Sequence, residues 1–145
     1  MKTMLSSLSV LSLLTSAALA AAGWSDDYEK AVSQAKSENK MVLLDFTGSD
    51  WCGWCIKLDK EVFSQAEFKD YAKKNLVLVE VDFPQSKKLA KKVVEQNEKL
   101  QNEHKVRGYP TIVVLNPGGK KVGELGYIPG GPKAFLAKLD ELKGK

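Results

Sequence analysis

Residues 41–55 read Met-Val-Leu-Leu-Asp-Phe-Thr-Gly-Ser-Asp-Trp-Cys-Gly-Trp-Cys, and most of what this sequence predicts follows from them. Residues 41–46 are a short apolar run, which is typical of a strand buried on both faces. A polar turn at 48–50 comes next, and we expect a helix that begins near Cys52 and runs toward Phe63. The sequence therefore places two cysteines in the first turn of a helix, directly after a buried strand.

The spacing of Cys52 and Cys55 has a chemical use at that place. Only a thiolate attacks a disulfide, and a free cysteine with a pKa of ~8.5 is mostly protonated at neutral pH. The unpaired N–H groups and the macrodipole of a helix N-terminus favour negative charge and lower that pKa. Both sulfurs lie on one side of the first turn, close enough to bond. We expect Cys52, at the exposed end, to attack a substrate and Cys55, one turn inside, to resolve the mixed disulfide.

The rest of the chain alternates between helical and extended patterns. Ser25 can cap a first helix, and Ser64 with Glu67 forms a capping-box pair at the start of another. We predict helices at 24–39, 64–75, 86–105 and 132–142, and strands at 76–82, 111–115 and 121–127. This order predicts an α/β fold in which a central mixed β-sheet is flanked by helices on both faces.

Length and composition limit the class of protein. With 145 residues, 43% hydrophobic and 28% charged, the chain is long enough for one soluble globular domain and too short for two of ordinary size. The net charge is +4, from 22 basic and 18 acidic residues, and the lysines are scattered. Those at positions 87, 88, 91 and 92 are typical of the solvated face of a helix. Nothing resembles a basic stripe interleaved with aromatic residues, so we expect no nucleic-acid binding.

Residues 1–22 have the order of a secretory signal peptide. Lys2 precedes an apolar run from Leu5 to Leu14, and Ala18-Leu19-Ala20 offers a cleavage site, with a second after Ala22. The rival interpretation is an uncleaved anchor, since the stretch is about long enough to span a bilayer. We expect cleavage, because the run is rich in serine and alanine, and hence a domain at 23–145 that works in the periplasm or as a secreted protein.

Two cysteines in an exported protein usually form a structural disulfide. A bridge between Cys52 and Cys55, however, closes a very small loop and removes little entropy from the unfolded chain, so a redox role explains the pair better. A structural zinc site needs four ligands, and the chain adds one histidine, His104, to its two cysteines. Covalent haem attachment needs a histidine after the second cysteine, where this chain has Ile56. We therefore expect no metal and no cofactor beyond the two cysteines.

These features resemble the thioredoxin superfamily over nearly all of the predicted mature chain. The resemblance is carried by Trp51-Cys52-Gly53-Trp54-Cys55, by Leu44-Asp45-Phe46, by Val106-Arg107-Gly108-Tyr109-Pro110-Thr111 and by Gly126. It implies a thioredoxin-like fold in which Pro110 is a cis-proline that faces the cysteine pair. It also implies that the backbone of Tyr109 lies beside Cys52, where an extended substrate segment can pair with it, and that Trp51 packs beside the active site.

The same resemblance implies a catalytic role for Asp45, as the buried acid that helps to move the proton off Cys55 during resolution. The alternative is a strand-end residue that turns toward water. We favour the catalytic role, because an aspartate inside an apolar run is costly unless it is used. Asp45 stands seven residues before Cys52, one more than in thioredoxin itself. The family proline of the active-site helix is replaced by Lys60, and the family lysine that pairs with the buried acid is replaced by Leu78.

The dipeptide between the cysteines is Gly53-Trp54, in place of the Gly-Pro of thioredoxin or the Gly-His of the isomerases. Because this dipeptide is a main determinant of redox poise in the family, the direction of the reaction does not carry over. Gly53 and Trp54 are candidate substrate-binding residues, together with Trp51, Tyr109 and Pro110. For Trp54 and Tyr109, ordinary packing is the alternative.

We therefore predict a thiol–disulfide oxidoreductase that acts on protein disulfides, with reductase favoured over oxidase or isomerase on the resemblance to thioredoxin alone. A second hypothesis, of a different class, is a binding or chaperone-like module that keeps the fold and carries its disulfide as a passive lock. A reductase needs electrons relayed from a membrane partner, and an oxidase needs reoxidation by one. Since the chain has no inserted dimerisation domain, we expect a monomer.

Overall fold

The computed structural model describes residues 23–145, and the predicted signal peptide at 1–22 lies outside the described residues. The described chain contains a five-stranded sheet with the order β1-β3-β2-β4-β5. The strands are β1 (Trp24–Ser25), β2 (Met41–Thr47), β3 (Leu76–Asp82), β4 (Thr111–Leu115) and β5 (Lys121–Leu125). Strand β3 runs parallel to β1 and β2, whereas β4 is antiparallel to β2 and β5, so the sheet is mixed, as predicted.

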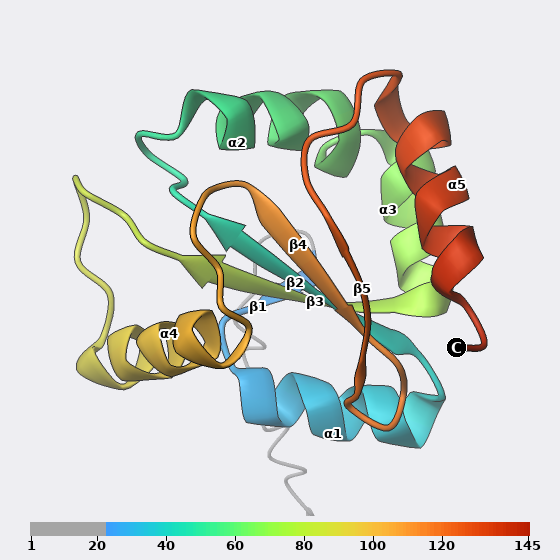
Figure 1. The fold of residues 1–145 in the computed structure, drawn as a ribbon, viewed down its shortest axis with the longest axis horizontal. Helices are drawn as coiled ribbons and strands as arrows, with labels where there is room; N and C mark the ends of the chain where they lie inside the picture. The colour runs from blue at the N-terminus through green and yellow to red at the C-terminus, as the bar shows by residue number, and fades with distance from the viewer. Residues whose placement is uncertain (1–22) are drawn as a thin grey trace, which may run out of the picture.

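Helices cover both faces of this sheet (Figure 1). On one face pack α1 (Tyr28–Glu38) and α4 (Lys91–Glu103). On the other pack α2 (Gly53–Leu58), its π-helical continuation η2 (Asp59–Phe63), α3 (Ala66–Asn75) and α5 (Gly131–Leu142). The predicted α/β architecture is therefore confirmed. Within residues 23–145, no helix is both long enough and apolar enough to cross a membrane.

Alternation along the buried strands divides the core into two layers. Leu43 of β2 belongs to the layer under α2, α3 and α5, which also contains Leu58 and Phe135. Its neighbour Leu44 belongs to the layer under α1 and α4. Successive side chains of a strand point to opposite faces, so Asp45 lies on the Leu43 side. That is the side of the active-site helix.

The N-terminal helix begins later than predicted. Trp24 and Ser25 pair with β3 as an edge strand, and Trp24 packs on Phe63 with ring centroids 5.2 Å apart. Burial of this large ring and pairing of its backbone outweigh the weak local preference for helix. The residue that caps α1 is Asp27 instead of Ser25, and its carboxylate accepts a hydrogen bond from the N–H of Lys30 at 3.1 Å.

Three other boundaries differ from the predicted ones. The Ser64–Glu67 capping box does not form, because the Ser64 hydroxyl donates to the carboxylate of Asp59 and α3 begins without a side-chain cap. Helix α4 begins later than predicted, because the segment before it is a loop held by the active-site turn. Strand β5 ends before Tyr127, whose ring packs on Trp54. At α4 and β5 a contact between distant segments outweighs the local pattern, whereas at Ser64 a competing hydrogen bond to the preceding turn does so.

Candidate redox site

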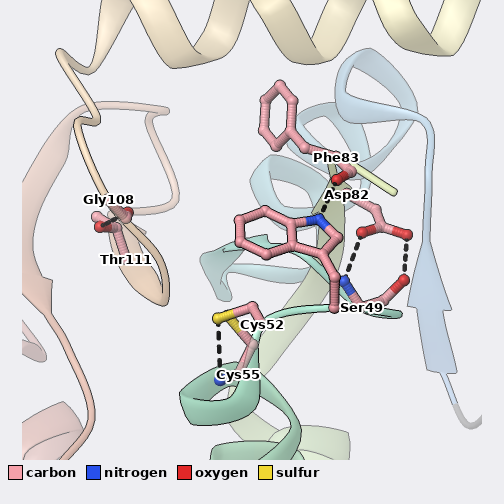
Figure 2. Close-up of a disulfide and its surroundings, with 8 residues drawn as sticks. Ser49, Cys52, Cys55, Asp82, Phe83, Gly108 and Thr111 are labelled. Atoms are coloured by element: carbon pink, nitrogen blue, oxygen red, sulfur yellow. Dashed lines mark hydrogen bonds between the residues drawn. A yellow bond between two sulfur atoms is a disulfide. The ribbon is translucent and has the colours of Figure 1, made fainter. Parts of the chain in front are cut away.

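Cys52 and Cys55 form a disulfide at the start of α2 (Figure 2). Their Cα atoms lie 5.2 Å apart, within the usual range for a disulfide. Cys52 is the N-cap residue of α2, and its Sγ accepts a hydrogen bond from the N–H of Cys55 at 3.3 Å. In the reduced protein this N–H faces the Cys52 thiolate for which the disulfide sulfur stands in. The helix N-terminus therefore favours the charged, attacking form of this cysteine.

Both cysteines are buried in the oxidised protein. Cys52 is 7% exposed and Cys55 is 5% exposed, so exposure does not separate the two sulfurs as we predicted. Their positions in the helix do separate them. Cys52 occupies the cap, whereas Cys55 lies inside the first turn on the buried face that also carries Leu58. The assignment of Cys52 as the attacking residue stays a prediction, and it rests on the cap.

The turn before the cysteines is held by Asp82 at the end of β3 (Figure 2). Asp82 is 4% exposed, and its carboxylate accepts hydrogen bonds from the N–H of Ser49 at 2.9 Å and from the Ser49 hydroxyl at 2.5 Å. Lys87 pairs with the same carboxylate at 3.3 Å. Asp50 holds the turn to the loop after β3, because it accepts hydrogen bonds from two backbone N–H groups there. These bonds lower the pKa of Asp50 below its usual range.

Three aromatic residues join this turn to the loops on either side. The indole N–H of Trp51 donates to the carbonyl of Phe83 at 2.8 Å. The ring of Tyr109 stands edge-on to Trp51 at 5.9 Å and stacks on Phe83 at 5.3 Å. Gly48 belongs to this packing, because a Cβ at that position would overlap the Trp51 ring. The cluster connects the turn before α2, the loop after β3 and the loop before β4.

The Tyr109–Pro110 peptide bond is cis, as the resemblance implied. The contact between Tyr109 and Trp51 brings this loop beside the N-terminal end of α2. Gly126 lies against the same loop, since a Cβ built on it would be 3.9 Å from the Pro110 carbonyl oxygen. The separate stretches that carry the resemblance are therefore neighbours in space.

Trp54 projects from α2 as an exposed ring. It is 58% exposed and packs on Tyr127, with ring centroids 5.1 Å apart. The ammonium of Lys57 lies over both rings, 5.1 Å from the centroid of Trp54 and 5.2 Å from that of Tyr127. Glu61 accepts a hydrogen bond from the Tyr127 hydroxyl, which raises the pKa of that phenol. Gly53, next to Cys52 at the start of α2, is exposed as well. The disulfide is therefore adjoined by the aromatic surface of Trp54 and Tyr127 and by a residue without a side chain.

Asp45 lies on the sheet face beneath α2, as its place in β2 requires. Its Oδ1 atom is buried and has no hydrogen-bond partner in the described part of the chain. Burial raises the pKa of this carboxyl well above its usual range, and the negative charges of Glu80, Asp59 and Asp82 raise it further. A carboxyl of raised proton affinity suits proton exchange with a thiol. Its role in resolution stays a prediction.

The residue opposite Asp45 on β3 is not the one we predicted. In the parallel register Asp45 pairs with Glu80, whereas Leu78 pairs with Leu43 in the apolar layer. Counting along the sequence does not reveal this, because the register depends on how β2 and β3 align. Asp45 thus faces a residue of the same negative charge, Glu80, whereas the family acid pairs with a positively charged lysine.

Replacing Asp45 by asparagine will stabilise the oxidised protein, and more strongly at high pH. The folded-state pKa of Asp45 is raised, so the folded state binds this proton more tightly than the unfolded chain does. The stability contributed by the protonated carboxyl is complete below the unfolded pKa and is lost as the pH rises through the folded pKa. We expect D45N to gain about 1–3 kcal/mol over the wild type at pH 8 and little at pH 4, because asparagine removes an unpaired buried charge.

Urea unfolding of the oxidised proteins at pH 4, 6 and 8 measures this difference. Asp70→Asn is the matched control, because Asp70 is an exposed aspartate on α3. A difference between D45N and the wild type that stays constant with pH would contradict a raised pKa at Asp45.

Sequence reasoning missed the residues that support the cysteines from other elements. Asp82 ends a buried strand, and Phe83 follows it, but neither stands near the cysteines in the sequence. Lys57 and Tyr127 gave no signal of their partnership with Trp54. A polar residue at the end of a buried apolar strand was the one available clue to Asp82. Among residues 23–145, no group of three or more His, Cys, Asp or Glu side chains is arranged to hold a metal ion.

Comparison with known proteins agrees with this geometry. Residues 28–143 match the family model described as a thioredoxin-like domain. The chain belongs to this thioredoxin-like family. Its disulfide-bonded cysteines lie at a helix N-terminus within the matched region. The motif and the family therefore imply the same redox chemistry.

Individual relatives narrow the chemistry of this thioredoxin-like protein. Disulfide bond reductase DsbH of Chlamydia pneumoniae is 38% identical over 114 residues, which are 79% of this chain and 69% of that protein. A solved structure of a DsbH oxidoreductase matches with a TM-score of 0.78 at 37% identity, covering 82% of each chain. A thioredoxin from Thermus thermophilus matches with a TM-score of 0.63 at 22% identity, over 84% of this chain and 87% of that one, which shows the fold alone. The protein is a thiol–disulfide oxidoreductase.

Proposed function

We propose that this thioredoxin-like protein is a reductase of protein disulfides that works outside the cytoplasm. The observation that carries the proposal is the Cys52–Cys55 pair at the N-terminus of α2, with Cys52 Sγ accepting a helix N–H. The similarity to a protein named disulfide bond reductase favours the direction of reduction. An oxidase or isomerase of the same fold is the alternative.

The reaction begins when the Cys52 thiolate attacks one sulfur of a substrate disulfide. A bond forms between Cys52 and that sulfur, the substrate disulfide breaks, and its second sulfur leaves as a thiolate that takes a proton from water. Cys55 then loses its proton, attacks Cys52 Sγ and releases the first substrate sulfur as a thiolate. Two electrons have passed from the cysteine pair to the substrate. The step needs no cofactor beyond the two cysteines.

The rim around the disulfide offers contacts for a polypeptide substrate. The backbone at Tyr109 and Pro110, beside Trp51, is our proposed pairing site for an extended segment that carries the reacting cysteine. Trp51 and Trp54 are 42% and 58% exposed and offer apolar surface next to the cysteines. Gly53 is exposed as well and adds no side chain that would block the approach.

The predicted signal peptide at residues 1–22 supports export, and the domain at 23–145 then works in the periplasm or as a secreted protein. After each turnover the disulfide has to be reduced again. Cytosolic thiol reductants do not act on exported proteins. We therefore propose a membrane redox partner that relays electrons to the disulfide. We propose that the protein works as a monomer.

The reduction potential of the Cys52–Cys55 pair tests the direction of the reaction. We expect about −270 mV, the value of thioredoxin, when the mature protein is equilibrated in dithiothreitol or glutathione buffers. Tryptophan fluorescence follows the equilibrium, since Trp51 and Trp54 adjoin the sulfurs. A potential of about −120 to −180 mV is that of an oxidase or isomerase, and it would refute the reductase assignment.

A further inference from the structure

Two carboxyl groups stand side by side on the sheet beneath the active-site helix. Asp45 of β2 and Glu80 of β3 are direct partners in the parallel register, and neighbouring strands lie about 4.8 Å apart. Leu43 and Leu78, two residues earlier on the same strands, both belong to the core layer under α2. Because side chains alternate along a strand, Asp45 and Glu80 share that face.

Among residues 23–145, no neutralising partner packs against Asp45. Its Oδ1 atom is buried and accepts no hydrogen bond within the described residues. On β4 its partner is Ile112, which carries no charge. The charged groups that act on it are all negative: Glu80 and Asp82 on β3, and Asp59 on η2. These neighbours therefore favour the protonated, neutral form of the Asp45 carboxyl.

Glu80, like Asp45 itself, is a half-buried residue. Burial raises its pKa, and so does the charge of Asp82. The cation that acts on it is Lys87, which is ion-paired to Asp82 at 3.3 Å. Two further carboxylates, Asp59 and Asp26, act on Glu80 in the same direction as Asp82.

Cys55 lies on the side of α2 that faces this pair. Cys55 and Leu58 are the buried residues of α2, and Leu58 packs in the same layer as Leu43. Asp59 follows Cys55 by one helical turn, and its charge acts on Asp45. The buried face of the helix therefore carries the resolving cysteine over the part of the sheet where the two carboxyl groups meet.

We propose that Glu80 is a positioning residue that acts through Asp45, and that the two carboxyl groups form one proton-holding pair that takes up the proton of Cys55. This inference rests on the proposed function. In the resolving step the Cys55 thiol gives its proton to the Asp45 carboxylate. The Cys55 thiolate then bonds to Cys52 Sγ, and the bond between Cys52 and the substrate sulfur breaks. That sulfur leaves with the electron pair as a thiolate.

A like charge beside Asp45 has a direct use in this step. An aspartate with an ordinary pKa of ~3.9 is a weak base for a thiol near 8.5, and a general base works best when its pKa approaches the operating pH. A neighbouring lysine would lower the pKa of Asp45, whereas Glu80 raises it. Glu80 thus makes Asp45 a stronger base without touching the reacting sulfurs.

Carboxyl ¹³C chemical shifts of the oxidised mature protein test the pair, because disulfide-bonded cysteines do not titrate. In the wild type we expect the Asp45 resonance to titrate in two steps, as coupled groups do. In Glu80→Gln we expect the main step at a midpoint about one pH unit lower. Glu80→Asp keeps the charge and restores the two-step curve. Glu29→Gln removes an exposed charge on α1, and we expect no change.

The rate at which Cys55 resolves a mixed disulfide gives a second readout. We expect the acid limb of its pH profile to move to lower pH in Glu80→Gln by the same amount, about one pH unit. An acid limb that stays in place while the Asp45 midpoint moves would overturn the role of the pair in resolution.

Two results of the titration would overturn the pair itself, whether or not the wild type reduces disulfides. One is an Asp45 midpoint in Glu80→Gln equal to that in Glu29→Gln. The other is a single-step Asp45 curve in the wild type, which needs no variant to fold. A wild type that reduces no disulfide, with the midpoint shifted as expected, refutes the proposed function and leaves the carboxyl pair standing.

Discussion

Cys52→Ser will lower the disulfide reductase activity to the background rate, a loss on the order of 10³-fold or more. A serine hydroxyl does not ionise at neutral pH, so the helix N–H that Cys52 Sγ accepts has no thiolate to stabilise. The reduction of insulin by the mature protein, with dithiothreitol as the electron source, measures this loss. Circular dichroism of the variant verifies that the fold is retained.

Cys55→Ser separates the roles of the two cysteines. It leaves Cys52 able to attack but removes the resolving thiol, so we expect a covalent mixed disulfide to accumulate on Cys52. Mass spectrometry of the non-reduced protein identifies the adduct. If Cys52→Ser traps the adduct instead, the order of attack is the reverse of the one inferred here. A double serine variant that keeps the activity would favour the binding or chaperone-like module.

Asp82→Ala will have the second large effect, on stability. Asp82 is 4% exposed and accepts two hydrogen bonds from Ser49, so its removal leaves the Ser49 N–H and hydroxyl without their partner. Lys87 also loses its ion pair. We expect the free energy of unfolding to fall by about 2–4 kcal/mol, the cost of breaking a buried, charge-assisted network. The turn before α2 loses its anchor at the same time, so kcat/KM falls as well.

Urea unfolding followed by tryptophan fluorescence measures the effect of Asp82→Ala. Asp70→Ala is the matched control, because it removes an exposed aspartate on α3, and we expect it to cost less than about 0.5 kcal/mol. Asp82→Asn keeps an acceptor for the Ser49 N–H and should fall between the two. Equal stabilities for Asp82→Ala and Asp70→Ala would show that Asp82 does not hold the turn.

Local patterns in the sequence predicted the elements that carry the cysteines. The apolar run of β2 and the Cys-x-x-Cys spacing are short-range features, so a strand followed by a helix start was readable without knowledge of the rest of the chain. The cis bond before Pro110 followed from the resemblance and is present in the structure. Trp24 was misplaced in a helix, because its packing on Phe63 joins residues far apart in the sequence.

The support of the site was not predictable in the same way. Asp82 and Phe83 reach the active-site turn from the end of another strand, and Tyr127 reaches Trp54 from the segment after β5. Each of these residues is present in the sequence, but the spacing between them along the chain does not predict which of them are in contact. Only the folded chain brings them together.

By itself the sequence determined the redox chemistry, since two cysteines at a helix start and their family motifs suffice to name it. The tertiary structure alone decided what surrounds that pair. A count along the chain placed Leu78 opposite Asp45, whereas the register of β2 on β3 places Glu80 there. The physical reason is the two-residue period of a strand. It determines which side chains share a face, while the pairing of two distant strands determines which of them are neighbours.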